Sequence, residues 1–119
     1  MTSTLSTKRK QVLISNVGKS KVIPFNKLFY HMFKRIETGA TISTFQDGLV
    51  VRGKFVSLTN LIHKNEIELI LELPNSREVE LYFKANDIEE VVHGFGSNYN
   101  SYTLFTSREV VPIIISNIE

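Results

Sequence analysis

The side chains of this 119-residue chain that could do chemistry are mainly cations, and they gather in its N-terminal third. Residues 1–35 contain eight Lys or Arg and no Asp or Glu, whereas residues 36–119 contain six cations and all twelve acids. Formal charges of +8 and −6 therefore underlie a net charge of only +2. This asymmetry predicts a basic surface that faces a polyanion, or the acidic half of another copy of the chain.

The predicted phosphate contacts come in two groups, an arm and turn before residue 24 and one face of the helix that follows. The contacting residues are Lys8, Arg9, Lys10, Lys19 and Lys21 on the arm and turn, and Lys27, Lys34 and Arg35 on the helix. Tyr30, between the helical cations, could stack on a base. The simpler interpretation is a solvated helix face, on which Lys34 and Arg35 interact with the helix dipole.

The sequence has no pattern typical of a catalytic or metal site. Its three histidines, His31, His63 and His93, stand about thirty residues apart, and there is no cysteine, so no zinc-ligand spacing occurs. The glutamates of residues 66–80 alternate with apolar residues, which predicts a solvated strand face and not a buried acid–base pair. No Ser-His-Asp arrangement can be argued from the spacing. We expect neither an enzyme nor a bound cofactor or metal.

One amphipathic helix is predicted over residues 24–39. Its apolar stripe follows the spacing i, i+3, i+4, i+7, i+8, i+11, and consists of Phe25, Leu28, Phe29, Met32, Phe33 and Ile36. Pro24 suits the first turn, and Gly39 suits a left-handed residue just past the end. Because a helix of about four turns is marginal alone, we expect the stripe to be buried against a sheet.

The rest of the chain predicts antiparallel strands. Asp47-Gly48, between strand-like residues 40–45 and 49–58, is a strong hairpin signal, and Gly53 suggests a bend or bulge. Residues 66–73 and 77–84 alternate apolar and charged side chains, as in a meander with one acidic solvent face. Further strands are expected at residues 11–17, 102–106 and 110–116, with a basic turn at 18–21, a strand or helical turn at 86–92 and an aromatic loop at 94–101.

We expect a single domain at residues 11–119, preceded by a disordered basic arm at residues 1–10. The polar N-terminus lacks an apolar signal segment and no long apolar run occurs, which predicts a cytoplasmic protein without a membrane partner. Pro112 predicts that Val110–Ser116 is an edge strand, through which two copies could pair as a homo-oligomer.

Residues 24–93 resemble the Sm-like small barrel, in which a short helix precedes a hairpin, a bent strand with a central glycine and two more strands. The resemblance is carried by the Asp-Gly hairpin and by the hydrophobic spacing of Val51-Arg52-Gly53, Phe55, Leu58 and Ile62. Thr59 and His63 stand where that family has its base-holding aspartate and asparagine. The family's late Arg-Gly or Lys-Gly dipeptide is absent from Leu81-Tyr82-Phe83-Lys84. The resemblance therefore implies the barrel more than Sm-type base recognition.

Together these patterns predict an α+β, mainly β, protein. We expect its N-terminal helix to pack on a small, bent antiparallel sheet or barrel of five to seven strands, similar to Sm and SH3 folds. The expected function is non-catalytic binding of RNA or DNA with low sequence specificity. The alternative is an adaptor or inhibitor that assembles through its edge strands, with the basic arm on an acidic protein surface.

Overall fold

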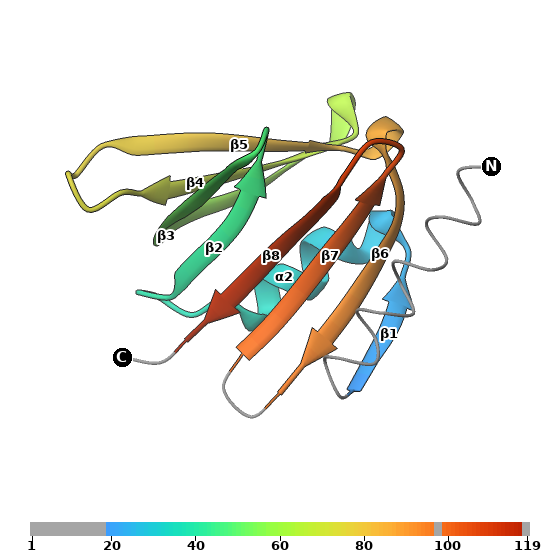
Figure 1. Ribbon diagram of the computed structural model, residues 1–119, viewed down its shortest axis with the longest axis horizontal. Coiled ribbons are helices and arrows are strands. Elements are labelled where there is room, and N and C mark those ends of the chain that lie inside the picture. The colour runs from blue at the N-terminus through green and yellow to red at the C-terminus, as the bar shows by residue number, and fades with distance from the viewer. Residues whose placement is uncertain (1–18, 97–98, 118–119) are drawn as a thin grey trace.

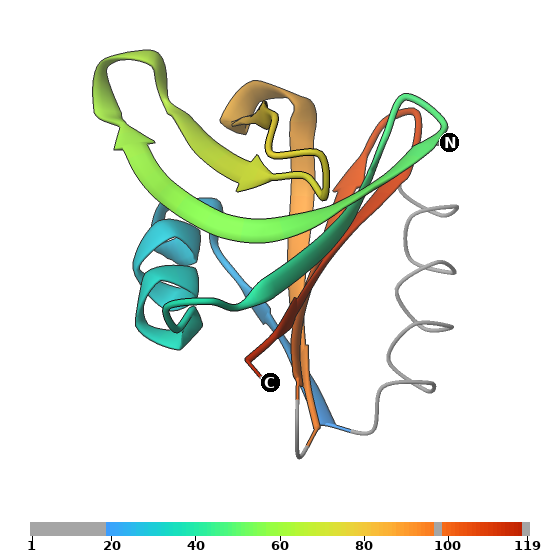
Figure 2. The same cartoon turned by 90° about the vertical axis from the view of Figure 1, so that its left-hand side faces the viewer.

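A computed structural model describes residues 19–96 and 99–117, and shows a sheet bent around a short helix (Figures 1 and 2). The strands are β1 (Lys19–Ile23), β2 (Thr41–Gln46), β3 (Leu49–Leu61), β4 (Glu66–Glu72), β5 (Glu78–Lys84), β6 (Ile88–Phe95), β7 (Tyr99–Thr106) and β8 (Val110–Ser116). The helix α2 (Leu28–Arg35) follows the single 3-10 turn η1 (Phe25–Lys27), and two further 3-10 turns are η2 (Ile62–Lys64) and η3 (Ala85–Asp87). Within the described ranges, no helix is long and apolar enough to cross a membrane.

The eight described strands form one antiparallel sheet in the order β1-β6-β7-β8-β2-β3-β4-β5. Two meanders, β2–β5 and β6–β8, join where β8 pairs with β2, and β1 adds to β6. The sheet is open, with β1 and β5 at its edges, so the predicted count of five to seven strands is too low, and of the two predicted forms, a bent sheet or a barrel, the sheet is found. The mainly β class, with one helix packed on an antiparallel sheet, is confirmed. Alternating strand patterns predict the meanders but do not say whether the outer strands meet.

The helix and the concave side of the sheet share one hydrophobic core. Leu28 and Met32 of α2 are fully buried, and Phe25, Phe29 and Ile36 pack partly buried against the core. The strand residues of this core are Ile23, Ile42, Leu58, Ile67, Leu69, Leu71, Leu81, Phe83, Val91, Tyr102, Leu104, Val111, Ile113 and Ile115.

Phe33 departs from the predicted buried stripe, because 56% of its surface is exposed. The sheet contacts the side of α2 that carries Leu28 and Met32, and each residue turns about 100° around the helix axis. Phe33 is therefore directed away from the core that holds Met32.

The helix ends earlier than the sequence suggests, and a side chain from beyond β8 caps it. Ile36 already has an extended backbone, with φ −90° and ψ 120°. Asn117 donates from Nδ2 to the carbonyl oxygen of Arg35 at 2.7 Å and accepts the backbone N–H of Glu37 at 3.1 Å. Gly39 does have a left-handed backbone (φ +85°), but it lies in the turn that leads to β2.

The hairpin and the glycine of β3 have separate physical causes. Asp47 and Gly48 have φ values of +50° and +81°, as the predicted Asp-Gly turn requires. A Cβ atom on Gly53 would lie 2.6 Å from the backbone oxygen of Glu72, so the close approach of β3 and β4 requires glycine there. The register of β3 shifts later, between Phe55 and Ser57, so Gly53 itself does not form the bulge.

Two predictions of strand placement are wrong. β8 lies inside the sheet between β7 and β2, so Val110–Ser116 is not an edge through which a second copy could pair. Pairing with β2 begins only at Ile113, and the missing N–H of Pro112 therefore breaks no bond to β2. Residues 19–21 belong to β1 and not to a basic turn. The predicted arm and the strand at 11–17 lie outside the described residues.

Candidate functional site

The exposed side of η1 and α2 is hollowed into an open cavity of about 520 Å³, which we call the helix cavity. Its lining residues are Asn26, Lys27, Tyr30, His31, Lys34 and Arg35. Residues spaced three or four apart share one side of a helix, which explains why Lys27, Tyr30, His31 and Lys34 meet there. Lys27, Tyr30 and Lys34 are exposed. The helix cavity is thus accessible to a ligand and is bordered by cations.

The electrostatic surroundings of the helix cavity are positive. Lys21 of β1 pairs with His93 of β6, whose ring contacts that of His31 on α2, so Lys21 lies on the same side of the sheet as the cations of α2. Within residues 19–96 and 99–117, Lys21, Lys27, Lys34 and Arg35 form no ion pair with a carboxylate. Arg35 instead donates from Nη1 to the carbonyl oxygen of His31 at 3.1 Å. Their charges therefore remain available to an anionic ligand.

Five of the nine predicted phosphate- and base-contacting residues come together at this surface. Lys27, Tyr30, Lys34 and Arg35 line the helix cavity, and Lys21 lies near it. Lys19 begins β1, where it pairs with Phe95 of β6. The remaining three, Lys8, Arg9 and Lys10, lie outside the described residues.

His31, which lines the helix cavity, is hydrogen-bonded to Tyr102 of β7. The Tyr102 hydroxyl donates to the carbonyl oxygen of His31 at 3.2 Å, and its oxygen lies 2.7 Å from Nδ1 of His31. The fully buried Tyr102 thereby fixes the helix on β7.

His93 packs directly against this pair. Its ring centroid lies 4.4 Å from that of His31, edge-on, and 4.7 Å from that of Tyr102, stacked. His93 is 2% exposed, and its Nε2 donates to Oδ1 of Asn100 at 2.9 Å. Its Nδ1 is buried without a partner among the described residues. We call His31, His93, Tyr102 and Asn100 the histidine cluster.

Both histidines of the cluster are kept neutral by their surroundings. Burial, followed by the charge of Arg35, lowers the pKa of His31 from 6.5 to about 4, and His93, Lys21 and Lys34 act in the same direction. Burial also lowers the pKa of His93, against the smaller opposing effect of its hydrogen bond to Asn100. His31 therefore adds no charge to the helix cavity at neutral pH, and a ligand meets its neutral ring.

Sequence reasoning did not predict the histidine cluster. The spacing of His31 and His93 carries no motif. Strand pairing brings His93 next to Tyr102, because Lys21, His93 and Tyr102 occupy directly paired positions across β1, β6 and β7. Only the alternation of β6 and β7 could have indicated that His93 and Tyr102 face the same side.

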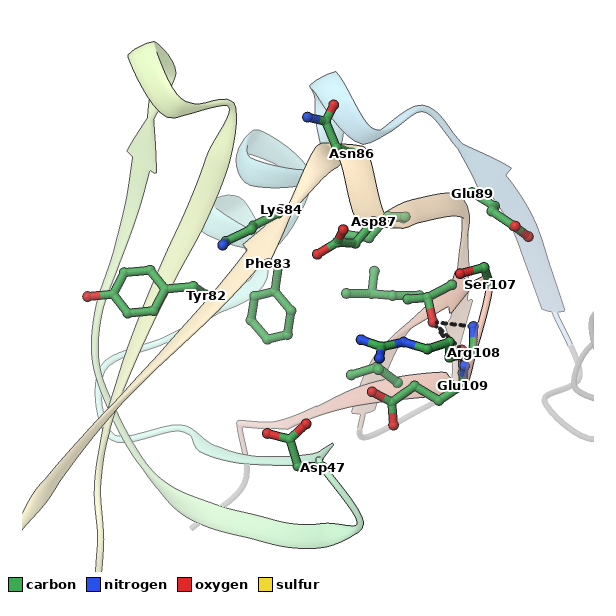
Figure 3. A pocket seen from close by; sticks show the side chains of 14 residues that line it. Asp47, Tyr82, Phe83, Lys84, Asn86, Asp87, Glu89, Ser107, Arg108 and Glu109 are labelled. Carbon is green, nitrogen blue, oxygen red and sulfur yellow. Dashed lines mark hydrogen bonds between the residues drawn. The ribbon is translucent and has the colours of Figure 1, made fainter.

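A second cavity, of about 290 Å³, lies between η3, β5 and the β7–β8 turn (Figure 3). Buried Phe83, Leu104 and Val111 contribute apolar surface to it. Its charged lining residues are four acids, Asp47, Asp87, Glu89 and Glu109, and two bases, Lys84 and Arg108. This excess of acids makes the second cavity unfavourable for a polyanion.

The Thr106 hydroxyl, at the β7–β8 turn in this second cavity, is already engaged. The Thr106 hydroxyl donates to the carbonyl oxygen of Glu109 and accepts the N–H groups of Arg108 and Glu109. It therefore stabilises the turn and is not free for a ligand.

Comparison with family models, with curated proteins and with solved structures finds no match to this chain. The described residues also contain no group of three or more His, Cys, Asp or Glu that could hold a metal ion. Interpretation of the site therefore rests on its residues and their geometry.

Proposed function

We propose that this protein binds nucleic acid without catalysis, and that the strand of RNA or DNA lies over the helix cavity. The observation that carries the proposal is the gathering of Lys27, Lys34 and Arg35 in the lining of one open cavity, with no described carboxylate paired to them. Cations that neutralise phosphates release condensed counterions, and this release drives non-specific binding.

Low sequence specificity follows from the types of side chain at the surface. Lysines hold phosphates as flexible point charges, whereas sequence is read by fixed donors and acceptors on base edges. The lining residues Lys27 and Lys34 belong to the first kind. The remaining predicted contacts, Lys8, Arg9, Lys10 and Lys19, would lengthen the track of phosphate contacts.

A salt titration tests the proposal. We expect the full-length protein to bind a short fluorescent oligonucleotide in a fluorescence-anisotropy assay, most tightly at low salt. The logarithm of the binding constant should fall with the logarithm of salt concentration by about 0.7 for each phosphate contact on a single strand, or about 0.9 on a duplex. Absence of binding at low salt would refute the proposal, and binding that ignores salt would refute its electrostatic mechanism.

The alternative function, a protein-interaction module, is restricted by the strand order. Among the described strands, only β1 and β5 offer a sheet edge for assembly. β5 favours this alternative most, because it is unpaired on one side and carries exposed Glu78 and Glu80 that complement the cations of a second copy. Light scattering in high and low salt tests it: an assembly held by these charges should dissociate as salt rises.

A further inference from the structure

Two aromatic rings beside the helix cavity are largely exposed. Tyr30 is 66% exposed and Phe33 is 56% exposed, although the neighbouring Met32 is fully buried. Phe29 supports both rings: it stacks on Phe33 with centroids 5.5 Å apart and meets Tyr30 edge-on at 5.8 Å. Because Phe29 also packs against the core, it anchors the two exposed rings to the body of the protein. We call Tyr30 and Phe33 the aromatic shelf.

Tyr30 of the aromatic shelf and the cations share one side of the helix. Tyr30 lines the helix cavity together with Lys27 and Lys34, which precede and follow it along α2 by three and four residues. Phe33 is three residues after Tyr30, so the two rings are neighbours on the helix surface. A ligand over the helix cavity therefore meets positive charge and the exposed ring of Tyr30 together, with Phe33 as the next exposed ring along the helix.

We propose that the nucleic acid bound here is single-stranded, with an unpaired base stacked on the aromatic shelf and flanking phosphates on Lys27 and Lys34. This inference rests on the proposed function and names the substrate class of the same site. Every base has a π-face, so stacking holds a single strand without reading its sequence. In a duplex the bases already stack on one another and are not free to stack on a side chain. A duplex held only through its phosphates would therefore make no stacking contact with the aromatic shelf.

Exposed aromatic rings can also anchor a protein partner. The charges beside this shelf favour a polyanion instead, because Lys21, Lys27, Lys34 and Arg35 are all positive and have no paired carboxylate among the described residues. The aromatic centre of a protein interface is usually depleted in lysine, whereas grooves for single strands combine cations with stacking rings.

The test compares three variants of the full-length protein with the wild type on two probes of equal charge. Anisotropy is measured with an unstructured single-stranded oligonucleotide and with a hairpin duplex of the same number of phosphates. The variants are Tyr30→Ala, its conservative partner Tyr30→Phe, and the control Tyr82→Ala, which removes an exposed tyrosine from the acidic strands. Circular dichroism and thermal melting show whether each variant is folded.

We expect tighter binding of the single strand than of the hairpin. Tyr30→Ala should weaken single-strand binding roughly 5- to 150-fold, the range measured for loss of one stacked base, while Tyr30→Phe and Tyr82→Ala stay near wild type. The salt slope should not change in Tyr30→Ala, because no phosphate contact is lost.

Three other outcomes overturn the inference in distinguishable ways. Equal affinity for both probes, unchanged by Tyr30→Ala but weakened by Lys27→Glu, would leave the proposed function standing and remove single-strand selectivity. Failure to bind either probe at low salt would remove the inference and the proposed function together. Concentration-dependent self-association that Tyr30→Ala abolishes, without nucleic-acid binding, would assign the shelf to a protein interface.

Discussion

Nδ1 of His31 on α2 lies 2.7 Å from the hydroxyl oxygen of Tyr102 on β7, although 71 residues separate them in the chain. The same hydroxyl donates to the backbone carbonyl of His31. Side-chain and backbone atoms of one helical residue are thus both held by a fully buried tyrosine. This relationship fixes how α2 presents the helix cavity, and it can be tested separately from ligand binding.

Tyr102→Phe should lower the free energy of unfolding by about 1–3 kcal/mol, because the buried ring stays in place while a hydrogen bond to Nδ1 of His31 is lost. Urea denaturation measures this change. Tyr82→Phe is the matched control: its hydroxyl bonds Glu68 and Glu80 at 3.0 and 2.8 Å on the exposed strand face. We expect the control to change stability by no more than about 0.5 kcal/mol. Equal effects of the two variants would contradict the structural role of Tyr102.

Stability should fall as pH is lowered from 6.5 towards 4. In the folded protein the pKa of His31 is about 4, and in the unfolded chain it is near 6.5, so between these values the unfolded state binds more protons. The depressed pKa of His93 acts in the same direction. Urea midpoints at successive pH values between 6.5 and 5 isolate the histidines, because carboxylates titrate mainly below this window.

His31→Gln provides the comparison for this pH dependence. The substituted protein no longer has the titrating ring at position 31, so its stability should change less steeply between pH 6.5 and 5 than that of the wild type. His63→Gln, at an exposed residue in η2, should keep the wild-type slope. An unaltered slope in His31→Gln would show that protonation of His31 is not linked to folding.

Asn117→Ala should destabilise the C-terminal turn of α2. The side chain of Asn117 bonds the carbonyl oxygen of Arg35 and the N–H of Glu37, so its loss removes two bonds at the helix end. We expect a loss of about 1–2 kcal/mol in the free energy of unfolding and faster amide exchange in α2. Asn60→Ala, at an exposed position of β3, serves as the control. Unchanged exchange in α2 would exclude Asn117 as its cap.

Gly53→Ala should destabilise the protein by about 1–3 kcal/mol, because the added Cβ would meet the backbone oxygen of Glu72 at 2.6 Å. Backbone atoms cannot rotate away as a side chain does, so β3 and β4 must separate. Thermal melting measures the loss, and Ser57→Ala on the same strand is the control. A melting temperature equal to that of the wild type would contradict the close contact between Gly53 of β3 and the backbone of Glu72 in β4.

The sequence patterns that predicted structure correctly are local ones. Asp47-Gly48 predicts its own turn, and the alternation of Ile67, Leu69 and Leu71 predicts which side of β4 is buried. The helix between Pro24 and Gly39 is also found, but shorter, because the cap comes from Asn117, whose position the helix sequence cannot indicate.

The errors concern how distant segments meet. Pro112 wrongly predicts an edge strand, because only the part of β8 before Ile113 lacks a partner in β2, while the rest of the strand pairs on both sides. His31 and His93 carry no spacing motif, and their contact is created by the packing of α2 on β6 and β7. The 3.6-residue period of the helix was enough to predict that its cations share one side. The position of Lys21 near them could not be predicted in this way, because it depends on β1 pairing with β6.

A charge-reversal experiment tests most directly whether the cations of the helix cavity bind phosphates. The variant Lys27→Glu/Lys34→Glu changes two exposed residues of the helix cavity, and Lys54→Glu/Arg77→Glu makes the same change in net charge at exposed residues outside it. We predict that only the first variant loses affinity for the oligonucleotide and that its salt slope becomes shallower by about 1.4 on a single strand. Equal losses in the two variants would mean that net charge alone causes binding, and they would contradict a binding site at the helix cavity.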